Sequence, residues 1–393
     1  MATGLSALQR GRAGPVGLVS ELPPFAALDL AAPASLVIGG HDIRAGHLVE
    51  EARQFARTSR AFEPGLVDQV ADDLNRIDHR ARPGILAHGG KAIAALADEN
   101  GVLADGLARD KIARVQADLR DFQTANELDR IVVVNLASTE PPFDSGSLPE
   151  TWSALEPLLD EPDCRLPSSS LYAIATLDLG HAFVNFTPSP GSTPAALDQL
   201  AIQRGAVHAG RDGKTGETLI KSALAPVFAM RHLNVMSWVG HNIFGNLDGR
   251  ILDDPANKQT KVASKDRMLG EILGYQPQSH ISIEYIRSLG DWKTAWDHIH
   301  FEGFLGTPMT LQFTWQGCDS MLAAPLVLDL ARFAERALRA GQSGVLSWLS
   351  CFFKSPAGTG EHNPTRQFGQ LLEWAGQLPE SAAGGATEPS DSN

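Results

Sequence analysis

The sequence has few cysteines, no long apolar run and a deficit of basic residues, and each shortage argues against a class of protein. Cys164, Cys318 and Cys351 are far apart and have neither metal-ligand nor redox spacing, which indicates free thiols in a reducing compartment. No apolar run approaches the roughly 18–20 residues of a membrane-spanning helix. The formal net charge of -13 argues against a broad nucleic-acid surface. We therefore predict a cytoplasmic protein that binds neither membranes nor nucleic acid.

Short apolar runs that alternate with helical segments predict an α/β fold. Residues 131–137 and 182–186 are continuous apolar runs rich in β-branched or aromatic side chains, and each ends at a polar or proline-containing turn. Such runs are typical of buried strands in a parallel sheet. Residues 35–43 also read as a buried strand that opens into a turn. Helical spacing covers residues 47–78, 105–129 and 169–179. The alternation implies βαβ units and a doubly wound sheet.

The pattern changes from about residue 219. Residues 281–286 and 309–315 alternate apolar and polar side chains, which predicts strands with one buried face and hence a second, open-faced sheet. Residues 321–333 predict a buried helix, with Pro325 near its start or at a kink. The tail from about residue 379 is rich in Ser, Ala, Gly, Pro and Glu, a composition typical of disorder.

Three polar motifs could carry chemistry. The string Asp212-Gly-Lys-Thr-Gly-Glu-Thr places a glycine-rich turn before a helical run, and free N–H groups at a helix N-terminus bind phosphate. It lacks P-loop spacing, and a plain helix cap is the alternative. The string Asn242-Ile-Phe-Gly-Asn-Leu-Asp-Gly groups amides and a carboxylate, although a turn-rich loop is the simpler explanation. Lys261 and Lys265 lie one helical turn apart along an apolar stripe, where lysines either snorkel to solvent or line a pocket.

From about residue 205 to 356 the chain resembles the myo-inositol-1-phosphate synthase family. The matching motifs occur in the family's order and at its intervals: Asp212-Gly-Lys-Thr-Gly-Glu-Thr, Lys221-Ser, Asn242-Ile-Phe-Gly-Asn-Leu-Asp-Gly, Lys261 with Lys265, Phe304-Leu-Gly and Phe353-Lys-Ser-Pro. Weaker strings extend the resemblance to roughly residues 15–375: Gly39-Gly-His-Asp-Ile, Ala137-Ser-Thr-Glu and Asn185-Phe-Thr-Pro. The shorter prokaryotic members are the most similar.

The resemblance implies a Rossmann-type NAD-binding domain with a doubly wound parallel sheet, and an inserted α+β domain for catalysis and tetramer formation. Residues 1–218 and 322–378 would form the NAD-binding domain, residues 219–321 the inserted domain, and residues 379–393 a disordered tail. The implied reaction is the NAD-dependent conversion of glucose 6-phosphate into 1L-myo-inositol 1-phosphate by a homotetramer. It proceeds by oxidation at C5, enolisation, aldol closure and return of the hydride.

The family motifs also imply the site residues. The catalytic residues would be Lys261, Lys265, Lys293, Lys354, Asp212 and Asp319. The cofactor would contact Asp42, Ala137, Thr139, Gly210, Asp212, Asn242 and Asp319. The substrate would contact Thr215, Gly216, Thr218, Lys221, Asn246 and Asp248. Such a site needs cations for a phosphate dianion and for enolate or alkoxide oxygens, together with groups that move protons. We expect the four lysines to converge on one cavity beside the turn that begins at Asp212.

Three alternatives stay open at this point. Some prokaryotic relatives use a divalent metal, for which Asp248 and Asp319 are the first ligands to test. Family members begin with a strand and a Gly-rich turn that holds the NAD pyrophosphate, whereas the residues from Met1 to Leu8 resemble the back half of the next helix. Either the natural start lies upstream or the chain is shortened, and this form is expected to bind NAD poorly. Rival functions are a catalytically silent sugar-phosphate-binding homologue and an NAD-dependent sugar-phosphate dehydrogenase.

Overall fold

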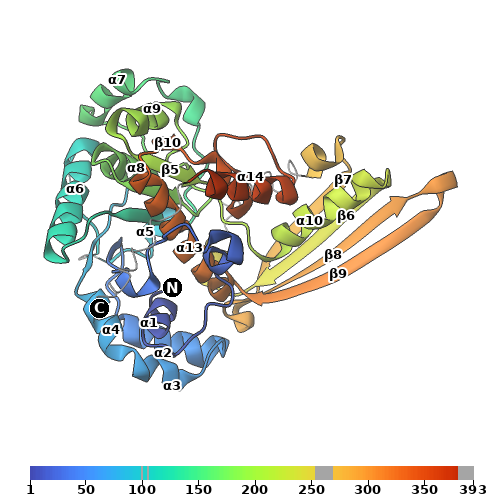
Figure 1. Ribbon diagram of the computed structural model, residues 1–393, viewed down its shortest axis with the longest axis horizontal. Helices are drawn as coiled ribbons and strands as arrows, with labels where there is room; N and C mark the ends of the chain where they lie inside the picture. Colours follow the sequence, from blue (N-terminus) through green and yellow to red (C-terminus); the bar gives the residue numbers. More distant parts are fainter. Residues whose placement is uncertain (99–100, 104–105, 253–268, 379–393) are drawn as a thin grey trace, which may run out of the picture.

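The computed structural model describes residues 1–98, 101–103, 106–252 and 269–378. These residues form a helix-rich body from which a four-stranded arm projects (Figure 1). The helices are α1 (Ala2–Gln9), α2 (Leu48–Ser59), α3 (Pro64–Gln69), α4 (Ala71–Asp78), α5 (Gly90–Ala94), α6 (Ala108–Ala125), α7 (Trp152–Leu155), α8 (Ser168–Asp178), α9 (Ala195–Arg204), α10 (Gly216–Met230), α11 (Leu247–Leu252), α13 (Asp319–Arg339) and α14 (Pro364–Gln377). The N-terminal segment packs on the body, where Leu5 and Leu18 contact Leu328 of α13.

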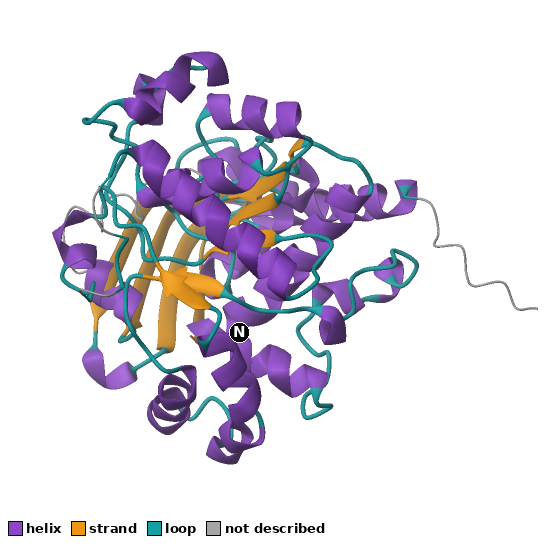
Figure 2. Cartoon of the chain, turned by 90° about the vertical axis from the view of Figure 1, so that its left-hand side faces the viewer, coloured by secondary structure: helices purple, strands orange, loops and turns teal. Residues whose placement is uncertain are grey.

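The main sheet of the body is parallel, in the order β10-β5-β4-β3. Its strands are β3 (Val132–Asn135), β4 (Ala182–Asn185), β5 (Val207–Gly210) and β10 (Gly344–Val345). Helices α8 and α9 pack beside Phe183 on one face, and α13 and α14 pack beside Val184 on the other. Helices therefore surround the central strands (Figure 2), and the predicted doubly wound α/β fold is confirmed.

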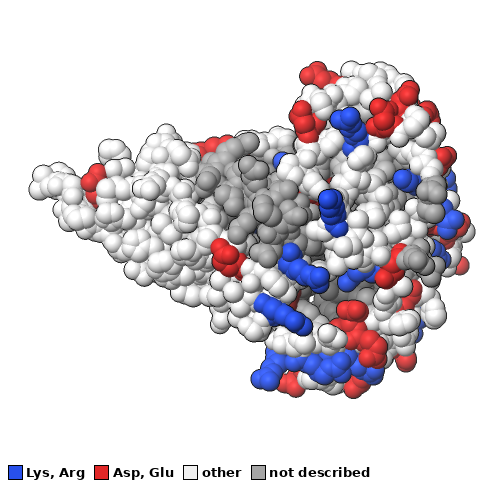
Figure 3. Space-filling model, turned by 180° about the vertical axis from the view of Figure 1, so that it is seen from behind, with Lys and Arg blue, Asp and Glu red and all other residues white. Residues whose placement is uncertain are grey.

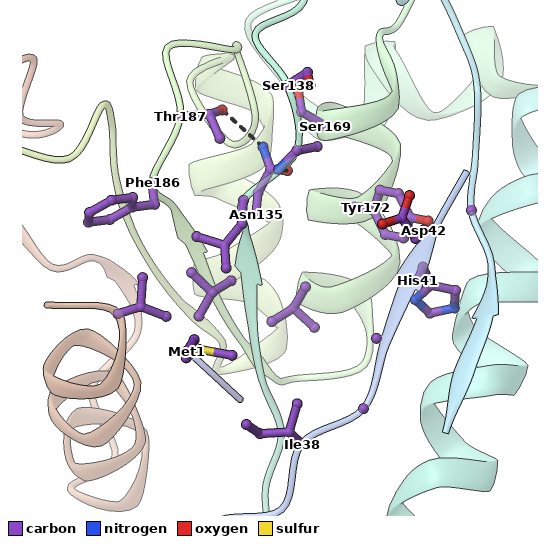
Figure 4. A pocket seen from close by; sticks show the side chains of 18 of the residues that line it. Met1, Ile38, His41, Asp42, Asn135, Ser138, Ser169, Tyr172, Phe186 and Thr187 are labelled. Carbon is purple, nitrogen blue, oxygen red and sulfur yellow. Dashed lines mark hydrogen bonds between the residues drawn. The ribbon is translucent and has the colours of Figure 1, made fainter. Parts of the chain in front are cut away.

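A second parallel pair, β1 (Gly40–Asp42) with β2 (Ala81–Pro83), lies across a cavity from β3. Among the residues that the structure describes, β1 pairs only with β2 and β3 only with β4. The free edges of β1 and β3 line opposite sides of the cavity (Figure 4). An unpaired strand edge leaves backbone N–H and C=O groups available to a partner.

The arm is a mixed sheet in the order β7-β6-β8-β9. Its strands are β6 (Asn234–Phe244), β7 (Gln278–Tyr285), β8 (Trp292–Glu302) and β9 (Pro308–Cys318). Helix α10 covers one face, where Phe228 packs beside Trp238 and Ile299. The opposite face carries His241 stacked on Trp296, with 5.8 Å between ring centroids. This confirms the prediction of a second sheet with one open face.

Most of the predicted elements exist, with shifted ends. The predicted strands at 131–137 and 182–186 are β3 and β4, and the helix at 169–179 is α8. The predicted strand at 35–43 is mostly wrong, because only Gly40–Asp42 pair and Pro33–Ser35 form a 3-10 turn. The proposed loop at 242–249 is also wrong, since β6 continues to Phe244 and α11 begins at Leu247. Strands β5, β6 and β8 were not predicted.

A bulge explains why β6 escapes a search for alternation. Its register against β8 shifts between Val235 and Ser237, so the buried side chains Val235 and Trp238 are three residues apart instead of two. A strand signal depends on strict period-two spacing, which a bulge interrupts. Pro325 lies inside α13, in its second turn, where the prediction left a choice between the helix start and a kink.

Candidate functional site

The cavity has a volume of about 1270 Å³ and lies at the carboxyl ends of β1, β3 and β5, where the arm and α13 join the body. Ligands of open parallel sheets bind at this edge. Usual small-molecule sites occupy roughly 300–1,000 Å³, so this cavity is large enough for an extended cofactor with a second ligand. Nine of the predicted site residues line it: Asp42, Ala137, Thr139, Asp212, Thr215, Asn246, Lys293, Asp319 and Lys354.

Asp212 and Lys354 form an ion pair in the cavity wall, although 142 residues separate them in the chain. Lys354 Nζ lies 2.8 Å from Asp212 Oδ1, and the backbone N–H of Lys354 donates to the carbonyl of Asp212. Asp212 has a φ of 62°, a left-handed conformation that non-glycine residues adopt only when the surroundings hold it. The N–H of Asp212 donates to the carbonyl of Thr187, so backbone bonds on both sides fix the pair.

Two glycines let the loop after β5 pass close to aromatic rings. A Cβ on Gly213 would lie 2.2 Å from the ring of Phe186, whose side chain Figure 4 shows beside the cavity. A Cβ on Gly216 would lie 2.8 Å from the indole nitrogen of Trp315. The loop then ends at Thr215, the N-cap of α10. The first N–H groups of this 15-residue helix therefore start at the cavity wall, which is the arrangement that binds anions.

Lys221 lies apart from the cavity, in a buried triad within the arm. Its Nζ is 2.8 Å from Glu217 Oε1 and 3.1 Å from Asp297 Oδ1, and Trp238 donates to the same Asp297 oxygen. Burial, with the nearby charge of Glu217, raises the pKa of Asp297. Lys221 is held between these two carboxylates, and Lys221, Gly216 and Thr218 are not part of the cavity lining. The structure thus brings Thr215, and not Lys221, to the cavity.

Asp291, which the sequence gave no reason to select, organises the wall opposite Lys354. It accepts hydrogen bonds from the amide nitrogen of Asn246 at 3.3 Å, from the N–H of Ser320 at 2.8 Å and from the thiol of Cys318 at 3.0 Å. Asp319, which begins α13, lies between the last two. This network appears only when β8 pairs with β9 and brings Trp292 opposite Cys318. No local sequence signal could therefore have identified it.

Lys293 adds a second ammonium group to the cavity wall. It lies on β8, and its Nζ is 5.3 Å from the centroid of the Phe244 ring, a cation–π distance. Lys293 and Lys354 thus reach one cavity from β8 and from the loop after η8 (Ser347–Phe352). Of the four lysines expected to converge, Lys293 and Lys354 line the cavity. Lys261, Lys265 and the side chain of Asp248 lie outside the described residues.

Some of the residues predicted to contact the cofactor line the cavity, and others do not. Asp42 ends β1 and accepts the N–H of Arg44 at 3.0 Å, while Ala137 and Thr139 follow β3. Figure 4 shows Asp42 across the cavity from Asn135, whose amide donates to Thr187 at 3.2 Å. Gly210 and Asn242 do not line the cavity. Asn242 is buried in β6.

Two absences hold for the described ranges only. Within residues 1–98, 101–103, 106–252 and 269–378, no group of three His, Cys, Asp or Glu side chains is arranged to hold a metal ion. No helix in the same ranges is long and apolar enough to cross a membrane. All three cysteines are free thiols, as the sequence indicated.

Comparisons of the sequence and the fold with known proteins identify the family. The family model described as myo-inositol-1-phosphate synthase matches residues 10–375. Inositol-3-phosphate synthase 1 of Bacteroides thetaiotaomicron is 31% identical over 386 residues, covering 93% of this chain and 87% of that protein. The human inositol-3-phosphate synthase 1 is 31% identical over 358 residues, and the match spans only 62% of its length. The crystal structure of inositol-3-phosphate synthase from Caenorhabditis elegans superposes with a TM-score of 0.84 at 24% identity, over 95% of this chain and 82% of that one, which shows a shared fold. The chain belongs to the myo-inositol-1-phosphate synthase family.

Proposed function

We propose that the protein catalyses the NAD-dependent cyclisation of D-glucose 6-phosphate to 1L-myo-inositol 1-phosphate. The family membership supports the reaction class. The single observation that carries the proposal is the Asp212–Lys354 ion pair, which lies in one cavity with Lys293 and beside the N-terminus of α10. That arrangement offers a proton-transfer pair, a second cation and an anion site within reach of one small sugar phosphate.

The cavity residues fit NAD at both ends of an extended molecule. Asp42 at the end of β1 is placed as the carboxylate that accepts hydrogen bonds from an adenosine ribose, and Ala137 and Thr139 flank the middle of the cavity. Asp212 and Asp319 lie at the end next to the arm, where the nicotinamide would meet the substrate. Bound NAD would supply the chemistry that side chains lack, namely a reversible hydride acceptor for C5. The overall reaction is therefore redox-neutral.

The substrate phosphate fits the start of α10. Thr215 contributes a hydroxyl at the cavity wall, and the N–H groups of Gly216 and Thr218 belong to the first turn of the helix. Helix N-termini attract anions through their free N–H groups and the helix dipole. Lys221 has an indirect role in this proposal. It pairs with Glu217 in the same turn and so neutralises a carboxylate that would repel the phosphate.

The lysines and the carboxylate handle protons and developing charge. Lys354, held by Asp212, is placed to exchange a proton with a sugar oxygen, and Asp212 keeps the ammonium group oriented. Lys293 supplies positive charge for an enolate or alkoxide oxygen at the cavity wall. Lys261 and Lys265 stay in the proposal as further cations on the strength of the family motifs alone.

The test is a turnover assay with glucose 6-phosphate and a small, catalytic amount of NAD. Inositol phosphate should accumulate well beyond the amount of NAD, with no lasting absorbance of NADH at 340 nm. Stoichiometric NADH without a cyclised product would instead identify a sugar-phosphate dehydrogenase. Binding of glucose 6-phosphate without any conversion would identify a silent homologue.

The proposal includes a cytoplasmic homotetramer built through the arm. The open face of the arm sheet carries His241, Trp296 and His298 in ring contact, and no helix of the described ranges packs on these rings. Seen from behind, the arm bears few charged side chains in comparison with the body (Figure 3). A flat, weakly charged face with an exposed tryptophan is typical of a surface that a second subunit covers.

A further inference from the structure

Lys214 belongs to the same loop as Asp212 and Thr215, yet its side chain leaves the cavity and enters the body. Only 3% of the residue is exposed. Its Nζ donates a hydrogen bond to Oε1 of Gln367 on α14 at 2.7 Å, and Gln367 is itself completely buried. The amide nitrogen of Gln367 donates to the carbonyl of Glu361, so the acceptor is held in place. The loop is thus tied to α14 from behind.

Lys214 differs in its partner from Lys221, which is also buried, and from Lys354, which is half-buried. Lys221 lies between two carboxylates and Lys354 pairs with Asp212, whereas the partner of Lys214 is a neutral amide. A buried ammonium that no opposite charge compensates is unfavourable for folding, and an apolar residue of similar size usually serves stability better. Stability of the fold therefore does not account for a charged side chain at this position, whereas a role in ligand binding does.

The surroundings show that the charge of Lys214 reaches the cavity. Burial lowers the pKa of Lys214 to about 8, the thiol of Cys351 acts in the opposite direction, and the positive charge of Lys354 lowers the pKa further. Cys351 supplies no counter-charge near neutral pH, because burial raises its pKa to about 12. Lys354, in contrast, lines the cavity. The Lys214 ammonium is therefore present at pH 7 and interacts with a group in the cavity wall.

We propose that Lys214 is a positioning residue for anion binding: held by Gln367 behind the loop that ends at Thr215, its ammonium group favours a phosphate dianion at the N-terminus of α10. The inference rests on the phosphate site of the proposed function. Solvent screens a buried charge far less than a surface charge, so the group acts through the loop without touching the ligand. It raises affinity for the doubly charged phosphate over neutral sugars.

The test compares the intact protein with Lys214→Met, which keeps the length of the side chain and removes its charge. Calorimetry without NAD should show that glucose 6-phosphate binds about tenfold more weakly to the variant at pH 7, the size expected for one charge at several ångströms in a partly shielded site. The midpoint of thermal unfolding should stay the same or rise. The matched control is Lys91→Met, which removes an exposed lysine on α5 and should change neither quantity.

The pH dependence separates a charge effect from a loss of packing. Because Lys214 is protonated below about pH 8, the ratio of the two affinities should be large at pH 7 and approach one at pH 9.5. A ratio of one at pH 7, or a ratio that does not change with pH, overturns the inference. If the intact protein binds glucose 6-phosphate no better than glucose, the phosphate site of the proposed function fails, and the inference with it.

A second measurement covers the case in which Lys214→Met does not fold. Anion binding next to a lysine that is half-protonated at pH 8 should draw protons from solution. Calorimetry of the intact protein in two buffers with different ionisation enthalpies measures this uptake. Net uptake near pH 8 that is reduced in Gln367→Met, where the ammonium loses its anchor, supports the role of Lys214. The absence of uptake in the intact protein contradicts it.

Discussion

Among the residues that the structure describes, Lys214 and Lys221 are buried and Lys354 is half-buried, and the partner of each lysine decides what it can do. Lys221 lies between two carboxylates, and Lys354 pairs with one carboxylate in the cavity wall. Lys214 donates its hydrogen bond to a neutral amide. The pairing of Lys221 stabilises the fold, and the pairing of Lys354 suits proton transfer. The charge of Lys214 is not compensated by a carboxylate, and in our proposal it attracts an anionic ligand. Spacing along the sequence does not distinguish the three, because every partner except Glu217 comes from a distant segment.

Replacement of Lys221 by methionine should weaken the fold severely. The variant leaves Glu217 and Asp297 buried together with no cation between them, and loss of one partner of a buried ion pair costs about 3–5 kcal/mol. Urea unfolding measures the change in free energy. The triple variant Lys221→Met, Glu217→Gln, Asp297→Asn is the control, and it should recover much of the loss. A single variant as stable as the parent would show that the carboxylates are accommodated by protonation alone.

Replacement of Asp212 by asparagine should impair turnover with little effect on stability. The amide keeps the shape of the side chain but removes the charge that holds Lys354, so general acid–base catalysis should fall by about 10²- to 10⁴-fold in kcat. KM for glucose 6-phosphate should change little, because Thr215 and α10 bind the phosphate. The control is Asp68→Asn, which alters an exposed carboxylate paired with Arg53. An undiminished kcat in Asp212→Asn would remove the pair from the mechanism.

The residues of the site divide into those that family motifs could identify and those that only the fold reveals. Asp212, Lys293 and Lys354 carry motifs, and all three line the cavity. Asp291 belongs to none of the motifs, and Lys214, although it lies inside Asp212-Gly-Lys-Thr-Gly-Glu-Thr, has no role that the motif implies. Their roles arise from contacts with Ser320 and Gln367, 29 and 153 residues away in the chain, and local pattern contains no information on contacts at that range.

At the scale of elements, α14 supports the site from behind and depends on one capping residue. Asn363 Oδ1 accepts the N–H groups of Thr365 at 3.0 Å and Arg366 at 3.4 Å, and Pro364 opens the helix. Because Gln367 lies in the first turn, fraying of this end would release Lys214. The cap of α14 thus connects a local helix signal to the loop at the cavity.

Substitution of Asn363 by alanine should therefore cost about 0.5–2 kcal/mol of unfolding free energy, the usual range for an N-cap. Equilibrium unfolding in urea measures the loss. Asn363→Asp is the matched control, because aspartate caps as well as asparagine and also favours the positive helix end. If alanine and aspartate variants are equally stable, the side-chain bonds of Asn363 do not support α14.

The elements differ in how well their sequence predicts them. Strands β3 and β4 were predicted because short, β-branched runs signal parallel strands directly. Strand β5 was missed because Val207-His-Ala-Gly is too short and too mixed to give a signal, although its pairing with β4 and β10 buries it fully. In the arm, β6 was not predicted because its bulge interrupts the alternation of buried and exposed side chains. Tertiary pairing, which local pattern does not record, decides each of these cases.

At the scale of the whole molecule, the arm is longer than its contribution to the cavity requires. It adds Lys293 to the cavity through the first residues of β8, yet most of its length projects away from the body (Figure 1). On the sheet face opposite α10, Trp296 is 37% accessible and lies beside His241 and His298. A second arm packed on this face would bury the rings and hold β8 straight where it enters the cavity.

Substitution of Trp296 by glutamate should break the proposed assembly. In a symmetric interface each substitution is present in every subunit, so like charges would meet across the contact and lose their hydration. Light scattering coupled to gel filtration should show a tetramer for the parent protein and smaller species for Trp296→Glu. The control is Ile202→Glu on α9, an exposed apolar residue of the body, which should leave the mass unchanged. If Trp296→Glu remains a tetramer, or if the parent is a monomer, the open face of the arm is not the assembly surface.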